Sequence, residues 1–394
     1  MYILVLNSGS SSIKFKVFRK KNQQLIVQGS VDALGLPHSH LEIQDSANHY
    51  FEKKFPNADH NLALEMIFKT LLAHHYIENL QQISLVGHRV VHGGEKYTEP
   101  ALINKKVITE IHKLSSLAPL HNPANLEGIL ACIKLLPKAK QVAVFDTAFH
   151  QTMPEIAYLY GLPTDLYRKH GIRRYGFHGT NHKYISEEAI KLLRKNRRSS
   201  SKLITVHLGN GCSVTAIRNG KSIDTSMGYT PLEGLIMGTR SGDLDPALVE
   251  VISKAKKMTL HQTEIFLNKQ TGLKGISGLD SDMRTIWQAV QKKHHLATLA
   301  LDLYCYRIVK YINSYIGVLN GVDAIVFSGG IGEHAWYVRE RVCASLKHLG
   351  ISVAPAKNKQ NAQIFSTPSS KARLIIVPAN EELEIARQSL KLIS

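Results

Sequence analysis

The sequence predicts an α/β protein with two mixed sheets, and three observations lead to this fold class. The chain has 394 residues, which is long enough for two domains that each enclose a core. Predicted strands and helices mix along the whole length instead of separating into blocks. Two hydrophobic hairpins, over residues 2–18 and 203–217, each join their strands through a Gly/Ser-rich or Gly/Asn turn. We therefore expect each hairpin to open one of two sheets flanked by helices.

The remaining elements follow from the spacing of apolar residues. Alternating or short apolar runs predict further strands over residues 24–31, 41–44, 83–91, 141–146, 323–327 and 373–377. Helical spacing predicts helices over residues 61–76, 125–136, 183–193, 246–257, 261–269, 283–319 and 381–392, with Pro123 opening the second. The sequence contains neither a solenoid repeat nor a low-complexity tail.

Composition narrows the class of protein. Residues 1–7 lack the basic region and cleavage site of a signal peptide, and no uncharged apolar run approaches the ~18 residues of a membrane helix. Four widely spaced cysteines without a C-x-x-C pair are typical of reduced, mostly buried thiols. We therefore expect a cytoplasmic protein that neither enters a membrane nor depends on disulfides.

The net charge of +18 is unusual. Its densest run, residues 191–202, follows a predicted helix and leads into a Ser-rich loop, and no aromatic residues interleave with the charges. This pattern indicates a solvated loop and not a nucleic-acid site. The rest of the excess is spread along the chain and agrees with anionic small-molecule ligands.

Each hairpin turn presents backbone N–H groups, which suit phosphate oxygens. Asn7 and Lys14 flank the first turn, where each could meet a metal–nucleotide complex. Neither turn is a Walker A loop, which requires G-x-x-x-x-G-K-[ST] between a strand and a helix. A single Gly/Ser turn is common in β-rich proteins, but the repetition indicates a duplicated fold that holds a polyphosphate from both sides.

Further polar residues lie at strand ends or among glycines. Arg89 ends a strand beside glycines, and its planar guanidinium can bind a carboxylate or a phosphoryl group through two N–H donors. His88 and His92 have an i, i+4 spacing, but the β-branched run and the missing Glu of H-E-x-x-H argue against zinc. Asp146 ends a buried strand, where carboxylates are often catalytic and also often cap the following turn.

Three more segments are candidates, although none is decisive alone. Residues 117–123 form a tight turn into a helix N-terminus, where an anion is favoured. His178 lies among glycines, where a structural histidine is the more common case. Arg240 adds a second arginine in a Gly-rich loop.

Ten segments together resemble the acetate kinase family, in order and across the whole chain. They are NSGSSSIKF, GHRVVHGGE, APLHNP, FDTAFHQTMP, RRYGFHGTNH, HLGNGCSV, EGLIMGTRSGDLDP, GISGLDSDMR, FSGGIGE and NEELEIAR. The resemblance implies duplicated ribonuclease-H-like (actin-like ATPase) domains with the nucleotide in the interdomain cleft. It implies an N-terminal domain of residues 1–150, on which the helix 382–394 packs back. Residues 151–381 would form the C-terminal domain, for nucleotide binding and dimerisation.

The resemblance also assigns roles to residues. The catalytic residues it implies are Arg89, Asp146, His178 and Arg240, with Asn7 and Glu381 serving a Mg²⁺ site that could also accept Mn²⁺. The acyl substrate would contact Arg89, and its methyl group would lie among Val91, Leu120, Phe177 and Pro231. The residues it implies for ATP or ADP are Lys14, His207, Leu208, Gly209, Asn210, Gly211, Asp282, Met283, Arg284, Gly329, Gly330, Ile331, Gly332 and Glu333.

Three positions depart from the family pattern. Asn181 stands where serine is usual, Ser328-Gly329 replaces Thr-Ala, and His334 replaces Asn. The last two border the expected adenine pocket, so they bear on nucleotide preference.

The resemblance predicts a homodimeric kinase that reversibly transfers a phosphoryl group from ATP to acetate, giving acetyl phosphate and ADP. Acetate is already an anion, so Asp146 is expected to orient an arginine or a metal-bound water and not to abstract a proton. A propionate kinase with the same machinery is the nearest alternative, and butyrate kinase motifs diverge more. A non-catalytic actin-like ATPase would not need Arg89, Asp146, His178 and Arg240.

Overall fold

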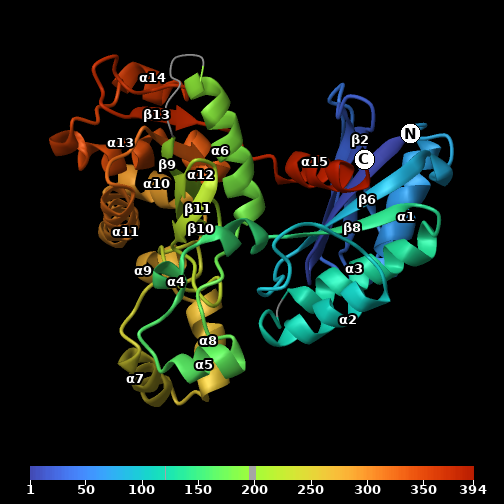
Figure 1. Cartoon of the computed structure of the whole chain (residues 1–394), viewed down its shortest axis with the longest axis horizontal. Coiled ribbons are helices and arrows are strands. Elements are labelled where there is room, and N and C mark those ends of the chain that lie inside the picture. Colours follow the sequence, from blue (N-terminus) through green and yellow to red (C-terminus); the bar gives the residue numbers. More distant parts are fainter. Residues whose placement is uncertain (120, 195–200) are drawn as a thin grey trace. The chain divides into compact units, whose positions relative to one another are not determined.

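A computed structural model describes residues 1–119, 121–194 and 201–394 (Figure 1). The chain divides into two compact units. Unit 1 comprises residues 1–149 and 380–394, and unit 2 comprises residues 150–379. We describe each unit by itself.

Unit 1 contains an eight-stranded sheet of order β5-β4-β3-β2-β1-β6-β8-β7. Its strands are β1 (Tyr2–Ser8), β2 (Ser12–Arg19), β3 (Leu25–Asp32), β4 (His40–Asp45), β5 (Tyr50–Lys54), β6 (Ile83–Val90), β7 (Ala101–Leu102) and β8 (Lys140–Phe145). The first five strands form an antiparallel meander, and β6 and β8 extend the sheet from β1 in parallel. The carboxyl ends of β1, β6 and β8 therefore lie side by side.

Unit 2 contains a five-stranded sheet of order β11-β10-β9-β12-β13. Its strands are β9 (Lys202–Leu208), β10 (Cys212–Arg218), β11 (Lys221–Thr225), β12 (Ala324–Ser328) and β13 (Arg373–Ile376). Three antiparallel strands are followed by two parallel ones, as in the run β3-β2-β1-β6-β8 of unit 1. This repeated pattern confirms the predicted α/β class with two sheets, each opened by a hairpin.

Helices accompany both sheets among the described residues. In unit 1 they are α1 (His60–Ala73), α2 (Lys105–Lys113), α3 (Asn122–Leu135) and α15 (Glu381–Ile393). In unit 2 they are α4 (Glu155–Tyr158), α5 (Thr164–His170), α6 (Gly179–Arg194), α7 (Ala247–Lys256), α8 (Leu260–Lys269), α9 (Gly272–Ser277), α10 (Met283–Gln291), α11 (His295–Leu319), α12 (Gly329–His334), α13 (Trp336–Ala344) and α14 (Pro355–Lys359). In the part of the chain that the structure describes, no helix has the length and apolarity needed to cross a membrane.

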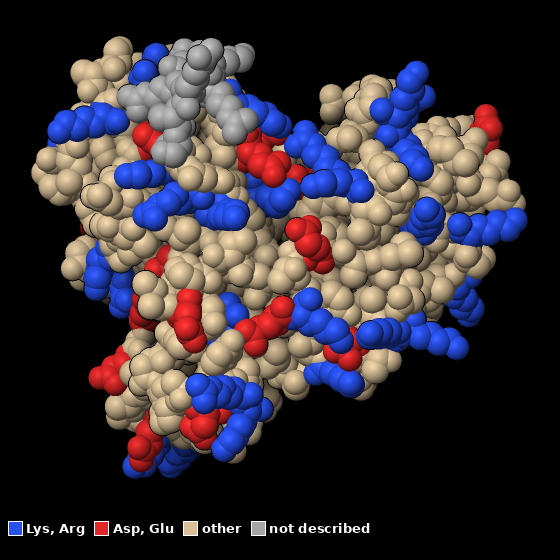
Figure 2. All heavy atoms as spheres, viewed as in Figure 1, with Lys and Arg blue, Asp and Glu red and all other residues tan. Residues whose placement is uncertain are grey.

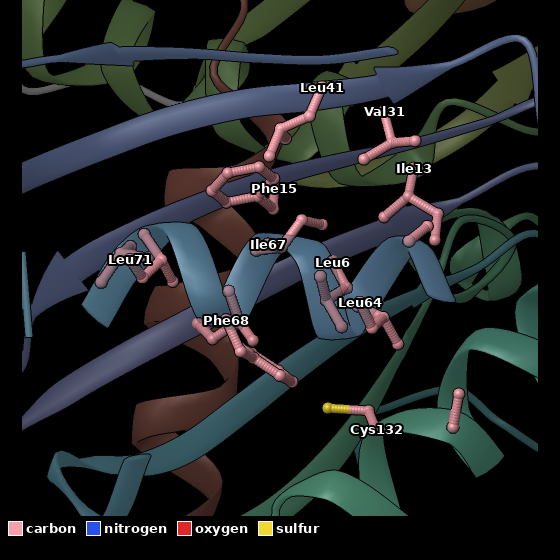
Figure 3. Packing of buried hydrophobic residues seen from close by; sticks show 14 of the residues in the cluster. Leu6, Ile13, Phe15, Val31, Leu41, Leu64, Ile67, Phe68, Leu71 and Cys132 are labelled. Atoms are coloured by element: carbon pink, nitrogen blue, oxygen red, sulfur yellow. The ribbon is translucent and has the colours of Figure 1, made fainter. Parts of the chain in front are cut away.

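The core of unit 1 follows from the two-residue period of its strands. Leu4 and Leu6 face one cluster, which α1 and α3 cover, while Ile3 and Val5 face the other. Figure 3 shows the first cluster, with the apolar side of α1 turned toward the strands. α15 covers the second face through Ile385 and Ala386 (Figure 1).

Gly87 on β6 allows α15 to come close to the sheet. A Cβ at this position would lie 2.7 Å from Ile385 Cγ2 and 2.7 Å from Ser389 Oγ, which is closer than real Cβ contacts. The close packing brings the first residue of α15, Glu381, to the carboxyl ends of the parallel strands.

The predicted helix over residues 283–319 is wrong in one respect, because it is two helices. Lys293 has a left-handed backbone, with φ 62°, and His294 caps α11 by accepting from the Ala297 N–H. The prediction missed this break because apolar spacing continues across it. It also missed β5, β7, β11, α2, α4, α5, α9, α12 and α14. Within the basic run, α6 extends to Arg194, and residues 195–200 lie outside the described residues.

The positive charge is spread over both units. On the face shown in Figure 2, Lys and Arg side chains lie over many elements and do not gather in one area. This distribution agrees with the expectation that most of the excess charge is not one binding patch.

Candidate active site

The first part of the site lies where three parallel strands of unit 1 end. Asn7 is the sixth residue of β1, Arg89 the seventh of β6, and Asp146 directly follows β8. Arg89 Nε donates to Asp146 Oδ2 over 2.9 Å, and its Nη2 donates to the same oxygen. Arg89 Nη1 donates to Asn7 Oδ1 over 3.2 Å. The Asp146 side chain is 1 % exposed and that of Arg89 20 %, so part of the Arg89 side chain still reaches the surface.

Glu381 joins this group from the first turn of α15. Its Oε2 lies 3.9 Å from Arg89 Nε. Burial, together with the charges of Asp146 and Glu382, raises the pKa of Glu381 to about 7, although Arg89 acts in the opposite direction. A positive charge bound here would favour the ionised carboxylate.

Lys14 lies opposite Asn7 in the β1–β2 hairpin. Its side chain is exposed and lines an open groove with Lys16 and Glu382. Lys16 is bound to Glu382 over 3.0 Å. Lys14 is therefore well placed for an anionic ligand at the strand ends.

A separate group of candidate residues surrounds the β9–β10 turn in unit 2. A Cβ at Gly211 would lie 3.2 Å from His178 Nε2 and 3.6 Å from Arg240 Nη1. A Cβ at Gly238 would lie 2.1 Å from Asn210 Oδ1. Gly238 therefore allows close packing against Asn210, and the side chains of His178 and Arg240 both lie next to Gly211.

His178 is held in an uncommon conformation by a polar chain. Its φ of 57° is left-handed, which is unusual for a residue with a side chain and is frequent at functional sites. Ser213 Oγ lies 2.8 Å from His178 Nδ1 and 2.7 Å from His182 Nε2. Burial lowers the pKa of His182 well below its usual value, so His182 is neutral. Nε2 of His178 is thus the nitrogen that faces the Gly211 turn.

His207 stands beside His178 at the end of β9. The two ring centroids are 4.5 Å apart. Asn181 Nδ2 lies 2.6 Å from His207 Nδ1. Asn181, one of the departures from the family pattern, therefore contacts a residue expected at the nucleotide, and the sequence alone did not indicate this contact.

The residues that the family resemblance assigns to the acyl methyl group belong to different units. Val91 of unit 1 and Phe177 of unit 2 are 6 % and 2 % exposed. The Pro231 carbonyl of unit 2 accepts from Arg240 Nη1 over 3.2 Å. Leu120 lies outside the described residues. Likewise, Arg89 and Asp146 belong to unit 1, whereas His178 and Arg240 belong to unit 2.

The remaining nucleotide candidates of unit 2 lie at the end of β9 and at the starts of α10 and α12. Asp282 caps α10 and also binds Arg284, whose side chain is 86 % exposed. Leu208 and Met283 are buried, so the backbone is the part of each that a ligand could reach. Gly329 has φ +78°, and its N–H donates to Glu333 Oε1 over 2.9 Å. Glu333 therefore holds the start of α12 in place.

His88 is structural, as the sequence pattern indicated. It is buried on β6, its Nε2 lies 2.8 Å from Gln141 Oε1, and burial lowers its pKa to about 4. Among the described residues, no group of three or more His, Cys, Asp or Glu side chains is arranged to hold a metal.

A sequence model of the acetokinase family matches residues 2–387. The acetate kinase of Carboxydothermus hydrogenoformans is 47% identical over 397 residues, covering 100% of this chain and 99% of that protein. The chain belongs to the acetokinase family.

Solved structures agree with this membership in the acetokinase family. The Porphyromonas gingivalis acetate kinase superposes with a TM-score of 0.94 at 42% identity, with both chains fully covered. A propionate kinase from Francisella tularensis also gives 0.94, at 41% identity and with 99% of each chain covered. The fold therefore does not distinguish the two substrates, and side chains must decide between them.

Proposed function

We propose that this acetokinase-family protein is an acetate kinase, which reversibly transfers a phosphoryl group from ATP to acetate and gives acetyl phosphate and ADP. The full-length similarity to curated acetate kinases supports this function. The observation that carries the chemistry is the guanidinium of Arg89, which is fixed by Asp146 and Asn7 while its side chain stays partly exposed.

Phosphoryl transfer requires mainly positioning and the neutralisation of charge. We assign Arg89 to the acetate carboxylate and Arg240, with His178, to the oxygens of the transferring group. Asp146 orients Arg89, because two N–H groups of the guanidinium already donate to its Oδ2. Acetate is a carboxylate at neutral pH, so the reaction needs no strong base.

The donor set at the strand ends fits Mg²⁺. Asn7 offers an amide oxygen and Glu381 a carboxylate, which are the hard oxygen ligands that Mg²⁺ prefers, and nucleotide phosphates usually complete its shell. Bound with ATP, the ion would neutralise phosphate charge; Mn²⁺ could replace it. Lys14 would contact the phosphates of ATP or ADP. We also assign the turn His207–Gly211 and the segments Asp282–Arg284 and Gly329–Glu333 to the nucleotide.

The residues that the family resemblance assigns to the methyl group favour acetate over the alternative, propionate. Val91, Phe177 and Pro231 are bulky, and Val91 and Phe177 are almost fully buried, so a methyl group is expected to fit better than an ethyl group. Propionate kinase is the second candidate because the Francisella tularensis enzyme has the same fold. A non-catalytic ATPase of this fold would leave Arg89 and Arg240 without a role.

We further propose that the protein is a cytoplasmic homodimer. The reduced, buried cysteines support a cytoplasmic location. Four exposed apolar residues on α11, Leu296, Leu299, Tyr306 and Val318, agree with an interface on unit 2. Sedimentation of the purified protein tests the dimer.

The experiment that tests the function is a coupled assay of the purified protein with ATP, Mg²⁺ and each of acetate, propionate and butyrate. The acetate kinase assignment predicts the highest kcat/KM for acetate. Activity highest with propionate would favour the alternative, and ATP hydrolysis without any acyl phosphate product would exclude both kinases.

A further inference from the structure

Two buried asparagines at the start of α3 hold the segments on which the unit 1 site is built. Asn122 is 0 % exposed and Asn125 3 %. They are three residues apart, so both lie on the helix face turned toward the sheet. Neither was singled out by the sequence motifs, which placed Asn122 in a turn and Asn125 at the start of a predicted helix.

Asn125 joins the ends of two strands. Its Nδ2 donates to the Ser8 carbonyl over 2.6 Å, and its Oδ1 accepts from the Val91 N–H over 3.0 Å. A carbonyl needs a donor and an N–H needs an acceptor, so these two bonds fix the orientation of the amide. Ser8 directly follows Asn7, and Val91 lies two residues after Arg89.

Asn122 makes a different pair of bonds. Its Oδ1 accepts from the His92 N–H over 3.1 Å, and its Nδ2 donates to the His92 carbonyl over 3.1 Å. Both bonds go to one residue after β6, and neither goes to β1. Asn122 therefore braces the turn beyond Val91 without touching the end of the strand that carries Asn7.

The helix approaches β1 closely at the same place. A Cβ at Gly128 would lie 2.2 Å from Ser8 Oγ, so α3 could not dock as it does with any side chain at this position. A buried amide that loses its hydrogen-bond partners destabilises the fold. The two hydrogen bonds of Asn125 therefore favour this position of α3 over other positions of the helix. Asn125 and Gly128 thus fix α3, β1 and β6 at one point.

We propose that Asn125 is a positioning residue that sets the distance between the metal ligand Asn7 and the substrate-binding Arg89. It acts through hydrogen bonds to the Ser8 carbonyl and the Val91 N–H, and not through a hydrogen bond to Asn7 or Arg89. The proposal rests on the proposed function, because it uses the roles assigned there to Asn7 and Arg89. Metal binding and acetate binding should therefore depend together on Asn125.

The test compares Asn125→Ala with Asn122→Ala. Each variant loses two buried hydrogen bonds from the same turn of α3, so general loosening of the helix should affect both alike. We expect Asn125→Ala to raise both the acetate KM and the half-saturating Mg²⁺ concentration at least tenfold. Asn122→Ala should raise the acetate KM while the half-saturating Mg²⁺ concentration stays within twofold of wild type.

A direct measurement of Mn²⁺ binding complements the kinetic comparison of the two variants. Electron paramagnetic resonance of Mn²⁺ with the protein and ADP should show at least tenfold weaker binding in Asn125→Ala and near wild-type binding in Asn122→Ala. Equal Mn²⁺ affinity in both variants would overturn the proposal. If Asn125→Ala does not fold, Asn125→Asp keeps the acceptor for Val91 and loses the donor to Ser8. It should weaken Mn²⁺ binding, and unchanged binding would again overturn the proposal.

The wild-type protein in the same series separates this proposal from the proposed function. Absence of acetyl phosphate formation by the wild type would refute the kinase assignment. The Mn²⁺ comparison between the two variants would still decide whether Asn125 positions the metal ligand.

Discussion

Arg174 forms an ion pair with Glu233, which follows Pro231 by two residues in the same loop. Arg174 Nη2 donates to Glu233 Oε1, and Tyr160 donates to the other carboxylate oxygen. Arg174 Nη1 also donates to the carbonyls of Thr225, Ser226 and Met227 at 3.0–3.2 Å. Arg174 therefore holds residues 225–227 at one end of the loop and Glu233 at the other.

Glu233→Gln should destabilise the protein, because it leaves the Arg174 charge largely buried without its carboxylate. Breaking such a pair costs about 3 kcal/mol, measured as the free energy of unfolding in urea. The matched control is Glu250→Gln, which removes the carboxylate of an exposed pair with Lys254 and should cost less than about 1 kcal/mol. Equal losses in the two variants would show that the loop does not depend on the buried pair.

Arg89→Ala and Arg240→Ala should each lower kcat by about a hundredfold or more while the fold stays intact. Each removes a cation aimed at charge on the carboxylate or the phosphoryl group, and such donors contribute roughly 3 kcal/mol. Circular dichroism checks the fold, and Arg168→Ala, at an exposed position of α5, serves as the control. Near-normal kcat in both site variants would contradict the assigned chemistry.

Under the proposed role of Glu381 in holding Mg²⁺, its raised pKa predicts that metal binding depends on pH. Because the proposed ligand is the carboxylate, Mg²⁺ affinity should weaken as the pH falls through about 7. Glu382→Gln removes a neighbouring negative charge, so it should lower the pKa of Glu381 and move the midpoint of this profile to lower pH. Protonation of the nucleotide is the same in both proteins and cancels in the comparison. Identical profiles would show that Glu381 is not the titrating group.

The same pKa affects stability without metal. The folded state holds a proton on Glu381 up to about pH 7, whereas the unfolded chain releases it near its usual value of 4.5. The folded state thus binds more protons between these values, and stability decreases as the pH rises through this window. Glu381→Gln should therefore raise the Tm of the metal-free protein at pH 8 more than at pH 4. A larger gain at pH 4 would reverse the sign and contradict the pKa.

Val91→Ala should narrow or reverse the preference for acetate. One methylene group in an apolar pocket is worth about 1–3 kcal/mol, or roughly 10–200-fold in kcat/KM. The measurement is the ratio of kcat/KM for acetate and propionate in the variant and in the wild type. An unchanged ratio would show that Val91 does not contact the methyl group of the substrate.

Local patterns predicted most of the fold. Alternation along β1 and β2 and the apolar spacing of α1 are strong signals because each buries one face. The break before α11 was not predicted, since it depends on the left-handed Lys293, and lysine is not a residue that marks such a turn. The strand ends were predicted to carry Arg89 and Asp146, and the structure places both in one hydrogen-bonded group.

The supporting residues could not be predicted in the same way. Asn125, Ser213 and Arg174 act through contacts with segments distant in sequence, such as the Ser8 carbonyl, 117 residues from Asn125. Asn and Ser near a helix or a turn are usually local caps, so their type gives no indication of a long-range role. Only the three-dimensional arrangement identifies them.

The close packing of α15 against Gly87 has a consequence for the order in which the protein matures. α15 follows all of unit 2 along the chain, yet it covers one face of the unit 1 sheet and supplies Glu381. During synthesis, residues 1–149 leave the ribosome while Ile3, Val5 and Leu85 are still uncovered and the carboxylate of Glu381 is not yet made. Unit 1 therefore completes its core and its site only after unit 2 has been translated, which prevents a half-made chain from assembling a working strand-end site.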